Sequence, residues 1–185
     1  TNNQFEKFVD ETGYITIAER EIDWEEMKKS LPVGTPKPHD SILQPGSLIF
    51  NDQIKTVDNM ENYFQWWRWQ RGANCKAPKG PGSNIENKGN FPVVHIAYED
   101  AIAYCDWANR RLPTEAEWES AAQGNYKNAV FPWGDDVDLL NSNANTWQGN
   151  FPIKNESIDG YEMVAPVKSF PANSIGIFDM VGNVW

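Results

Sequence analysis

Residues 111–124 read RLPTEAEWESAAQG, and this stretch carries the clearest helix signals in the chain. Thr114 is placed to cap a helix, and Glu117 three residues later completes a capping box. Gly124 supplies the stop, because glycine readily adopts the left-handed conformation in which helices end. We therefore expect a helix between Thr114 and Gly124, with Trp118 facing the core.

The rest of the chain alternates short elements with long irregular segments. The strongest helix is expected over residues 98–110, where Tyr98, Ile102 and Cys105 share one face. Segments rich in Gly, Pro and Asn separate the elements, above all residues 32–92. This arrangement predicts an α+β fold with little regular structure. Further helices or strands are expected at residues 1–13, 23–30, 47–50, 164–167 and 177–178.

The composition fits one acidic globular domain. The chain has 185 residues, of which 40% are apolar, and 16 Lys and Arg stand against 26 Asp and Glu, so that the net charge is −10. A chain of this length builds one core, so we expect a single domain over residues 1–185. The charge argues against binding to duplex nucleic acid, which requires cations to displace phosphate counterions. No apolar run approaches the roughly 18–20 residues that cross a bilayer, so no membrane insertion is expected.

The sequence lacks the common signatures of nucleotide and hydrolytic sites. It has no phosphate-binding glycine loop, no HExxH pair, no EF-hand and no nucleophile elbow. Its two cysteines, Cys75 and Cys105, are too few for a disulfide framework or a Cys₄ zinc site. Two buried thiols are the simpler expectation, and a single bridge between them is the alternative.

An Asn-rich segment and an Asp-Gly turn suggest a cation site. Residues 141–146 read NSNANT, and residues 159–161 read DGY. Calcium takes about six to eight oxygen ligands and tolerates irregular loops, and these residues could supply several of them. The alternative is that Asn, Asp and Gly act only as turn formers. The same argument applies more weakly to Asp179 with Gly182 and Asn183.

Aromatic residues gather in the proline-rich part of the chain, where residues 66–69 read WWRW. Aromatic side chains on a loop can form a flat wall for a peptide or a sugar. The alternative is that they plug a small core beneath the long loop.

Several of these motifs resemble the formylglycine-generating enzyme (sulfatase-modifying factor) family, and they occur in the right order. The ordered set is specific and covers nearly the whole chain, although no single motif decides the matter. The main stretches are PVVH at 92–95, RLPTEAEWE at 111–119, FPWGD at 131–135, NTWQGNFP at 145–152, DGY at 159–161, APV at 165–167 and GIFDMVGNVW at 176–185. Upstream, Gly13-Tyr14, Ala18-Glu19, Trp66-Trp67 and Gly72-Ala73-Asn74 fit as well.

The resemblance implies a C-type-lectin-like α+β fold and an oxidoreductase activity. Family members convert a cysteine in a C-x-P-x-R segment of a sulfatase to Cα-formylglycine with molecular oxygen. They hold copper(I) between two active-site cysteines, and thiolates are the soft ligands that Cu(I) prefers. Neither Cys75 nor Cys105 matches that pair, so the catalytic residues are expected beyond Trp185 and these 185 residues alone are expected to be inactive. Cys105 matches a structural cysteine whose disulfide partner is expected in the same later segment.

The resemblance also assigns metal and substrate residues. One calcium site would be built from four oxygens, those of the Asn145 side chain, the Thr146 carbonyl, the Asp159 side chain and the Tyr161 carbonyl. A second would combine a glutamate beyond the chain with three groups, the Asp179 side chain and the carbonyls of Gly182 and Val184. The candidates for the substrate groove are three tryptophans, Trp66, Trp67 and Trp185.

Two interpretations of function stay open at this point. The first is a sulfatase-modifying oxidase for which this chain supplies the scaffold, the calcium sites and part of the groove. The second is a non-catalytic lectin-like module that binds a peptide or a glycan. An iron-dependent sulfur-transfer relative ranks last, because it would need a histidine cluster and the chain has two histidines. The chain begins at Thr1 without a signal-peptide pattern, so we expect it to be truncated there and leave a secreted or periplasmic location open.

Overall fold

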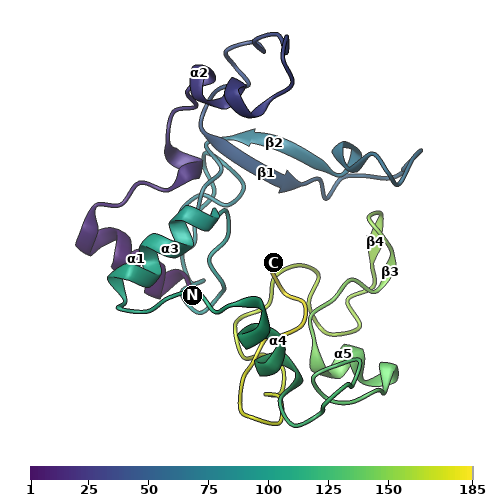
Figure 1. Ribbon diagram of the computed structural model, residues 1–185. Helices are drawn as coiled ribbons and strands as arrows, with labels where there is room; N and C mark the ends of the chain where they lie inside the picture. The colour runs from purple at the N-terminus through teal and green to yellow at the C-terminus, as the bar shows by residue number, and fades with distance from the viewer. Residues whose placement is uncertain (185) are drawn as a thin grey trace.

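A computed structural model describes residues 1–184 of the chain (Figure 1). It mixes short helices with a few short strands, and irregular segments connect them. The helices are α1 Asn2–Thr12, α2 Trp24–Met27, α3 Tyr98–Trp107, α4 Glu115–Gln123 and α5 Leu140–Asn143. The strands are β1 Gly46–Phe50, β2 Trp67–Arg71, β3 Gly149–Asn150 and β4 Lys154–Asn155. No helix among these residues is long and apolar enough to span a bilayer.

The main core lies between α1 and α3, which run side by side in Figure 1. The element expected at residues 1–13 is the helix α1, in which Thr1 forms a capping box and Gly13 ends the helix in the left-handed region. Phe8 is almost fully buried, and its ring meets Tyr104 edge-on with ring centroids 5.7 Å apart. Phe5, Val9 and Cys75 complete the buried cluster. Aromatic and aliphatic burial therefore holds α1 on α3.

The predicted apolar face of α3 was wrong, although the helix itself is confirmed. Tyr98 is 69% exposed and Ile102 is 37% exposed, whereas Tyr104 and Trp107 pack against the core. The fully buried residue of α3 is Asp100. Its carboxylate accepts hydrogen bonds from Tyr14 and Ile17, which follow α1 in the chain. The helix therefore turns a different face inward from the one that its apolar residues predict.

The strands β1 and β2 form an antiparallel pair in which Leu48 faces Trp69 and Phe50 faces Trp67. The expected strand at 47–50 is thus confirmed. Residues 51–66 connect the two strands and carry no further strand. An aromatic cluster formed by Phe50, Trp66, Trp67, Trp147 and Phe151 joins this hairpin to the β3–β4 hairpin.

Helix α4 begins and ends as predicted, with Thr114 as its cap and Gly124 as its end. The expectation that Trp118 faces the core was wrong, because Trp118 is 49% exposed and α4 has no buried residue. The helix is held by polar contacts instead. The Asn173 side-chain amide donates to the carbonyl of Ala121 over 2.7 Å, at the carboxyl end of the helix.

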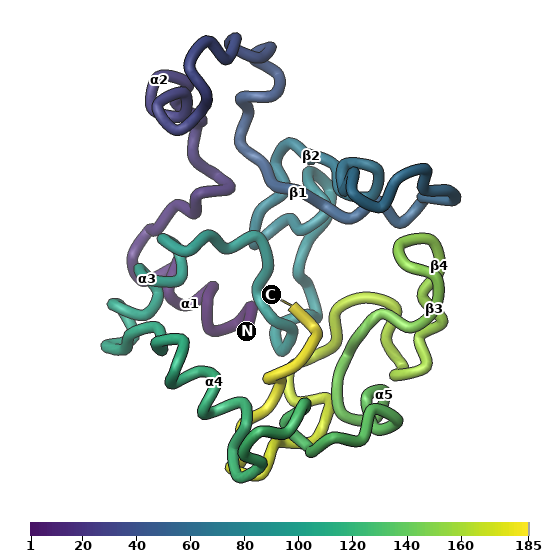
Figure 2. Tube along the Cα trace, turned by 45° about the vertical axis from the view of Figure 1, so that its right-hand side comes forward, coloured from purple at the N-terminus to yellow at the C-terminus, as the bar shows by residue number. Residues whose placement is uncertain are grey.

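The strands expected at 164–167 and 177–178 are absent, and residues 156–184 are irregular. The backbone groups of this segment bond to single side chains and loops rather than to a ladder. The Ala165 N–H donates to Asn183 Oδ1 over 2.8 Å, and the Val167 N–H donates to the Asn90 carbonyl over 2.9 Å. Asn145 and Gly182 form an isolated parallel bridge, so the end of this segment runs beside the loop that follows α5 (Figure 2).

Candidate metal centre

Thr146 and Asp159, two of the predicted calcium ligands, lie against each other. The Asp159 Oδ2 atom accepts a hydrogen bond of 2.9 Å from the Thr146 N–H. Its Oδ1 atom accepts one of 2.9 Å from the Tyr161 N–H, which closes a tight turn over Gly160. Gly160 has a φ of +93°, a region that favours glycine. The Asp-Gly-Tyr sequence thus folds locally so that the carboxylate faces the Asn-rich loop.

Gln148 lies at the centre of this group, although it is not among the residues predicted from the sequence. Its Nε2 atom donates to Asp159 Oδ2 over 2.8 Å and to Thr146 Oγ1 over 3.0 Å, and it also contacts the Thr146 carbonyl oxygen. Its Oε1 atom accepts a hydrogen bond of 3.3 Å from the Asp159 N–H. The side chain is buried, with 8% of its surface exposed. Three oxygens therefore converge on one amide nitrogen.

Asn145 connects this group to the end of the chain. Its Nδ2 atom donates to the Met163 carbonyl over 2.8 Å and to Asn183 Oδ1 over 3.1 Å. Its own carbonyl accepts the Asn183 N–H over 2.9 Å. Gly182 passes so close that a Cβ atom there would lie 2.1 Å from the Asn145 carbonyl oxygen. The first set of predicted ligands thus shares its neighbourhood with Gly182 of the second set.

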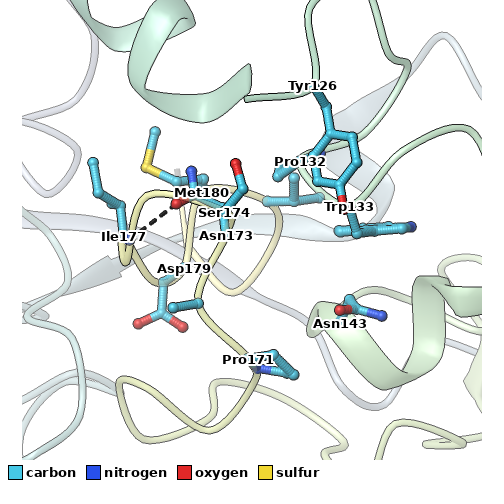
Figure 3. Close-up of a pocket in the computed structure, with 12 residues that line it drawn as sticks. Tyr126, Pro132, Trp133, Asn143, Pro171, Asn173, Ser174, Ile177, Asp179 and Met180 are labelled. Atoms are coloured by element: carbon cyan, nitrogen blue, oxygen red, sulfur yellow. Dashed lines mark hydrogen bonds between the residues drawn. The ribbon is translucent and has the colours of Figure 1, made fainter. Parts of the chain in front are cut away.

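Among the described residues, Asp179, the side-chain member of the second set, is not joined by a hydrogen bond to the other two members, Gly182 and Val184. Asp179 Oδ2 accepts the Lys168 N–H over 2.9 Å, and Asp179 lines a surface hollow together with Trp133 and Tyr126 (Figure 3). The Gly182 carbonyl accepts the Val184 N–H over 3.0 Å. Within residues 1–184, no hydrogen bond connects Asp179 to Gly182 or Val184, so this set remains a prediction.

The predicted groove tryptophans lie in different surroundings. Trp66 is 6% exposed and packs edge-on against Phe151. This burial favours the alternative in which the tryptophan fills a small core over the interpretation of an exposed binding wall. Trp67 is half-buried beside Phe50. In the same cluster, the indole N–H of Trp147 is buried without a hydrogen-bond partner among the described residues. Trp185 lies outside the described residues.

The two cysteines do not form a soft-metal site. Both are free thiols, so the alternative of a bridge between them is not found. Burial, and then the negative charge of Glu19, raises the pKa of the Cys75 thiol to about 11. A thiol of this kind is protonated at neutral pH and is a poor thiolate ligand. Across residues 1–184, no three His, Cys, Asp or Glu side chains come together as a metal-binding group.

Comparison with known proteins identifies relatives along the whole chain. Residues 1–185 match the sequence model of a family described as "Sulfatase-modifying factor enzyme 1-like domain". The chain is 42% identical over 187 residues to the formylglycine-generating enzyme of Mus musculus and 44% identical over 189 residues to that of Mycobacterium tuberculosis. It is 38% identical over 192 residues to a Bos taurus protein named "Inactive C-alpha-formylglycine-generating enzyme 2".

Each of these matches covers 100% of this chain, but it covers 45%, 59% and 55% of the three relatives, respectively. The chain thus spans about half the length of the curated relatives it matches.

Proposed function

This chain belongs to the sulfatase-modifying factor family, and we propose that it is the scaffold part of an enzyme that oxidises a sulfatase cysteine to Cα-formylglycine. The observation that carries the proposal is the match of all 185 residues to the family, with identities above 40% to relatives named formylglycine-generating enzyme. The substrate would be a sulfatase polypeptide with a C-x-P-x-R segment. The fold proposed with it is the C-type-lectin-like form of the family.

Copper(I) would supply the oxygen chemistry in such an enzyme, and the residues of this chain do not fit it. Cu(I) prefers soft thiolate ligands, whereas Cys75 is a buried core thiol with a raised pKa and Cys105 is a single free thiol on α3. We therefore propose that the copper ligands lie in the part of the protein that this chain does not span.

Calcium fits the first predicted site better. Hard cations take carboxylate, carbonyl and amide oxygens, and the Thr146 carbonyl and the Asp159 carboxylate already converge there. We propose that these two groups bind calcium and that Asn145 and Tyr161 complete the site. Its role would be structural, because the bound ion would fasten the 145–161 loop, which is poor in regular structure.

The proposed reaction is tested on the protein that carries this chain. The protein is loaded with copper and incubated with oxygen, a thiol reductant and a C-x-P-x-R peptide. Mass spectrometry is expected to show the peptide cysteine converted to an aldehyde, and a matched peptide with serine in place of cysteine is expected to stay unchanged. A folded, copper-loaded protein that leaves the cysteine peptide intact would contradict the proposal.

A second candidate is a non-catalytic lectin-like module that binds a peptide or a glycan. The observation that favours it is the 38% identity to a relative named as inactive. Saturable binding of the C-x-P-x-R peptide without any conversion, measured by calorimetry under the same conditions, would support this second function over the first.

A further inference from the structure

The β1–β2 pair has two strands, and in the described part of the chain no further strand lies beside the outer edge of β2 (Figure 1). We propose that this edge binds an extended, acidic segment of a partner polypeptide, which pairs with β2 as a third, antiparallel strand. Three features of the edge support this, which are its open backbone groups, its exposed apolar side chains and its charge. Binding alone is involved, so the oxidation of a sulfatase cysteine plays no part in it.

The ladder between β1 and β2 fixes which backbone groups of β2 point outward. The Asn51 N–H donates to the Trp66 carbonyl over 2.8 Å, and the Gly72 N–H donates to the Pro45 carbonyl over 2.9 Å. Hydrogen-bonded and non-hydrogen-bonded pairs alternate along an antiparallel ladder. The even-numbered residues of β2 therefore bond to β1, and the odd-numbered residues direct their N–H and C=O groups away from it.

Trp67 and Trp69 are the open positions of this edge. Within residues 1–184, no hydrogen bond reaches the outward N–H or C=O group of either tryptophan. At Arg71 the edge is closed, because a Cβ atom on Gly80 would lie 3.1 Å from the Arg71 carbonyl oxygen. An antiparallel strand laid beside β2 would thus form a pair of backbone hydrogen bonds at each tryptophan, which is the way extended peptides add to open sheet edges.

The side chains of this edge offer apolar surface to an added strand. Trp69 is 42% exposed, and Leu48, which faces it across the pair, is 39% exposed. Trp67 lies on the same face of the sheet as Trp69, because side chains alternate between the two faces of a strand. Apolar side chains that lie opposite an aromatic residue on a neighbouring strand stabilise the pairing. Apolar residues of the partner would therefore lie opposite the two tryptophans.

The charge of this region selects an acidic partner. Residues 62–85 contain four cations and no Asp or Glu, in a chain whose net charge is −10. Lys76 and Lys79 are paired with carboxylates of this chain. Arg68 and Arg71 are exposed and form no ion pair within residues 1–184. Opposite charges on neighbouring strands attract and like charges repel, so the edge suits carboxylates rather than a second copy of itself.

The position of Arg68 defines the pattern that a partner needs. Its guanidinium donates to Gln70 Oε1 over 2.8 Å, and it lies on the face opposite to Trp69. A fitting segment therefore alternates apolar residues, which face the tryptophans, with acidic residues, one of which faces Arg68. A C-x-P-x-R segment does not have this pattern, because its arginine would be repelled and its proline has no N–H to donate.

The test uses a capped probe peptide with the sequence glutamate-valine-glutamate-valine-glutamate. Its valines would lie opposite Trp67 and Trp69, and its central glutamate opposite Arg68. The peptide is titrated by calorimetry into the protein that carries this chain, in low salt, where exposed charges are screened least. We expect saturable binding, and we expect the same peptide with lysine in place of glutamate to bind about fivefold more weakly or worse.

Methyl groups on the peptide nitrogens separate strand addition from attraction between charges. Methylation of both valine nitrogens removes the donors that would face β2, so we expect the Kd to rise about fivefold or more. Methylation of the central glutamate nitrogen is the matched control and should change the Kd less than about twofold, because that N–H would point away from β2.

A matched pair of variants locates the site. Arg68→Gln should weaken binding of the acidic peptide about two- to fivefold. Arg110→Gln changes the net charge equally at an exposed position after α3 and should leave the Kd unchanged. Equal effects of these two variants, equal effects of the valine and glutamate methyl groups, or no saturable binding of the acidic peptide would each overturn the proposal. The peptide series needs only the wild-type protein, so the test holds even if a variant fails to fold.

Discussion

Replacing Asp100 by asparagine is expected to cost the protein much of its stability. The Asp100 carboxylate is fully buried. It accepts hydrogen bonds from the Tyr14 hydroxyl and the Ile17 N–H at 3.0 Å each, and from the Ala97 N–H at 2.8 Å. These bonds fasten residues 14–17 to the start of α3. An amide can keep the acceptor for two of them, but it turns an N–H₂ group toward the third donor.

The cost follows from the lost charged bond. A hydrogen bond to a charged group contributes about 1.5–3 kcal/mol, and the negative charge near the start of α3 adds about 0.3–1 kcal/mol. We therefore expect Asp100→Asn to lower the free energy of unfolding by about 2–4 kcal/mol in urea titrations. Tyr14→Phe, which removes one neutral donor, should cost about 1 kcal/mol. Asp106→Asn, on the exposed side of the same helix, is the matched control and should stay within about 0.5 kcal/mol of wild type.

Equal unfolding midpoints and slopes for Asp100→Asn and wild type would refute this reasoning. It would mean that the contacts between residues 14–17 and α3 are not formed in solution, or that water replaces them at no cost. A changed slope with an unchanged midpoint would point to an altered unfolded state rather than to the loss of these native hydrogen bonds.

Three further predictions concern the irregular half of the protein and the core thiol. Gly182→Ala should lower the melting temperature and cost about 1–3 kcal/mol, because Gly182 has a φ of +74° and a new Cβ would meet the Asn145 carbonyl oxygen; an unchanged melting curve would argue against this close approach. Since burial raises the pKa of Cys75 to about 11 from an ordinary 9, the folded state holds this proton more tightly than the unfolded state. Stability should therefore fall by up to about 2–3 kcal/mol as pH rises from 9 to 11, and Cys75→Ala should lack this part of the decline when the two are compared by urea unfolding. Asp159→Ala should abolish any rise of melting temperature on adding calcium, whereas the exposed Asp138→Ala should retain it; a calcium response in Asp159→Ala as large as that of wild type would exclude Asp159 as a ligand.

Helix boundaries were predictable because they depend on nearby residues. The capping box at Thr114 and the stop at Gly124 need only a few neighbouring side chains, and both are confirmed. Strand β1 was found for the same reason, since its apolar run stands between turn-forming residues.

The faces of the helices were harder to predict because partners distant in sequence decide them. Asp100 is held in the interior by hydrogen bonds from the Tyr14 hydroxyl and the Ile17 N–H. These partners are more than 80 residues away in the sequence, so the pattern of apolar residues along α3 does not reveal them. Trp118 stays exposed because α4 is held by its capping residues and by Asn173 rather than by an apolar face.

The candidate site was predicted in part. The pairing of Thr146 with Asp159 is present in the structure, and Asn145 lies beside them. Gln148 was missed because a glutamine between Trp147 and Gly149 carries no pattern of its own. The signal that could have found it is its chemistry, since a side-chain amide beside an Asn-rich loop and an Asp-Gly turn can donate to their oxygens.

A crystal structure of the protein grown with calcium tests the central claim most directly. We predict a cation within about 2.3–2.6 Å of the Thr146 carbonyl oxygen and an Asp159 carboxylate oxygen. A structure in which saturating calcium leaves this position without an ion would contradict the account.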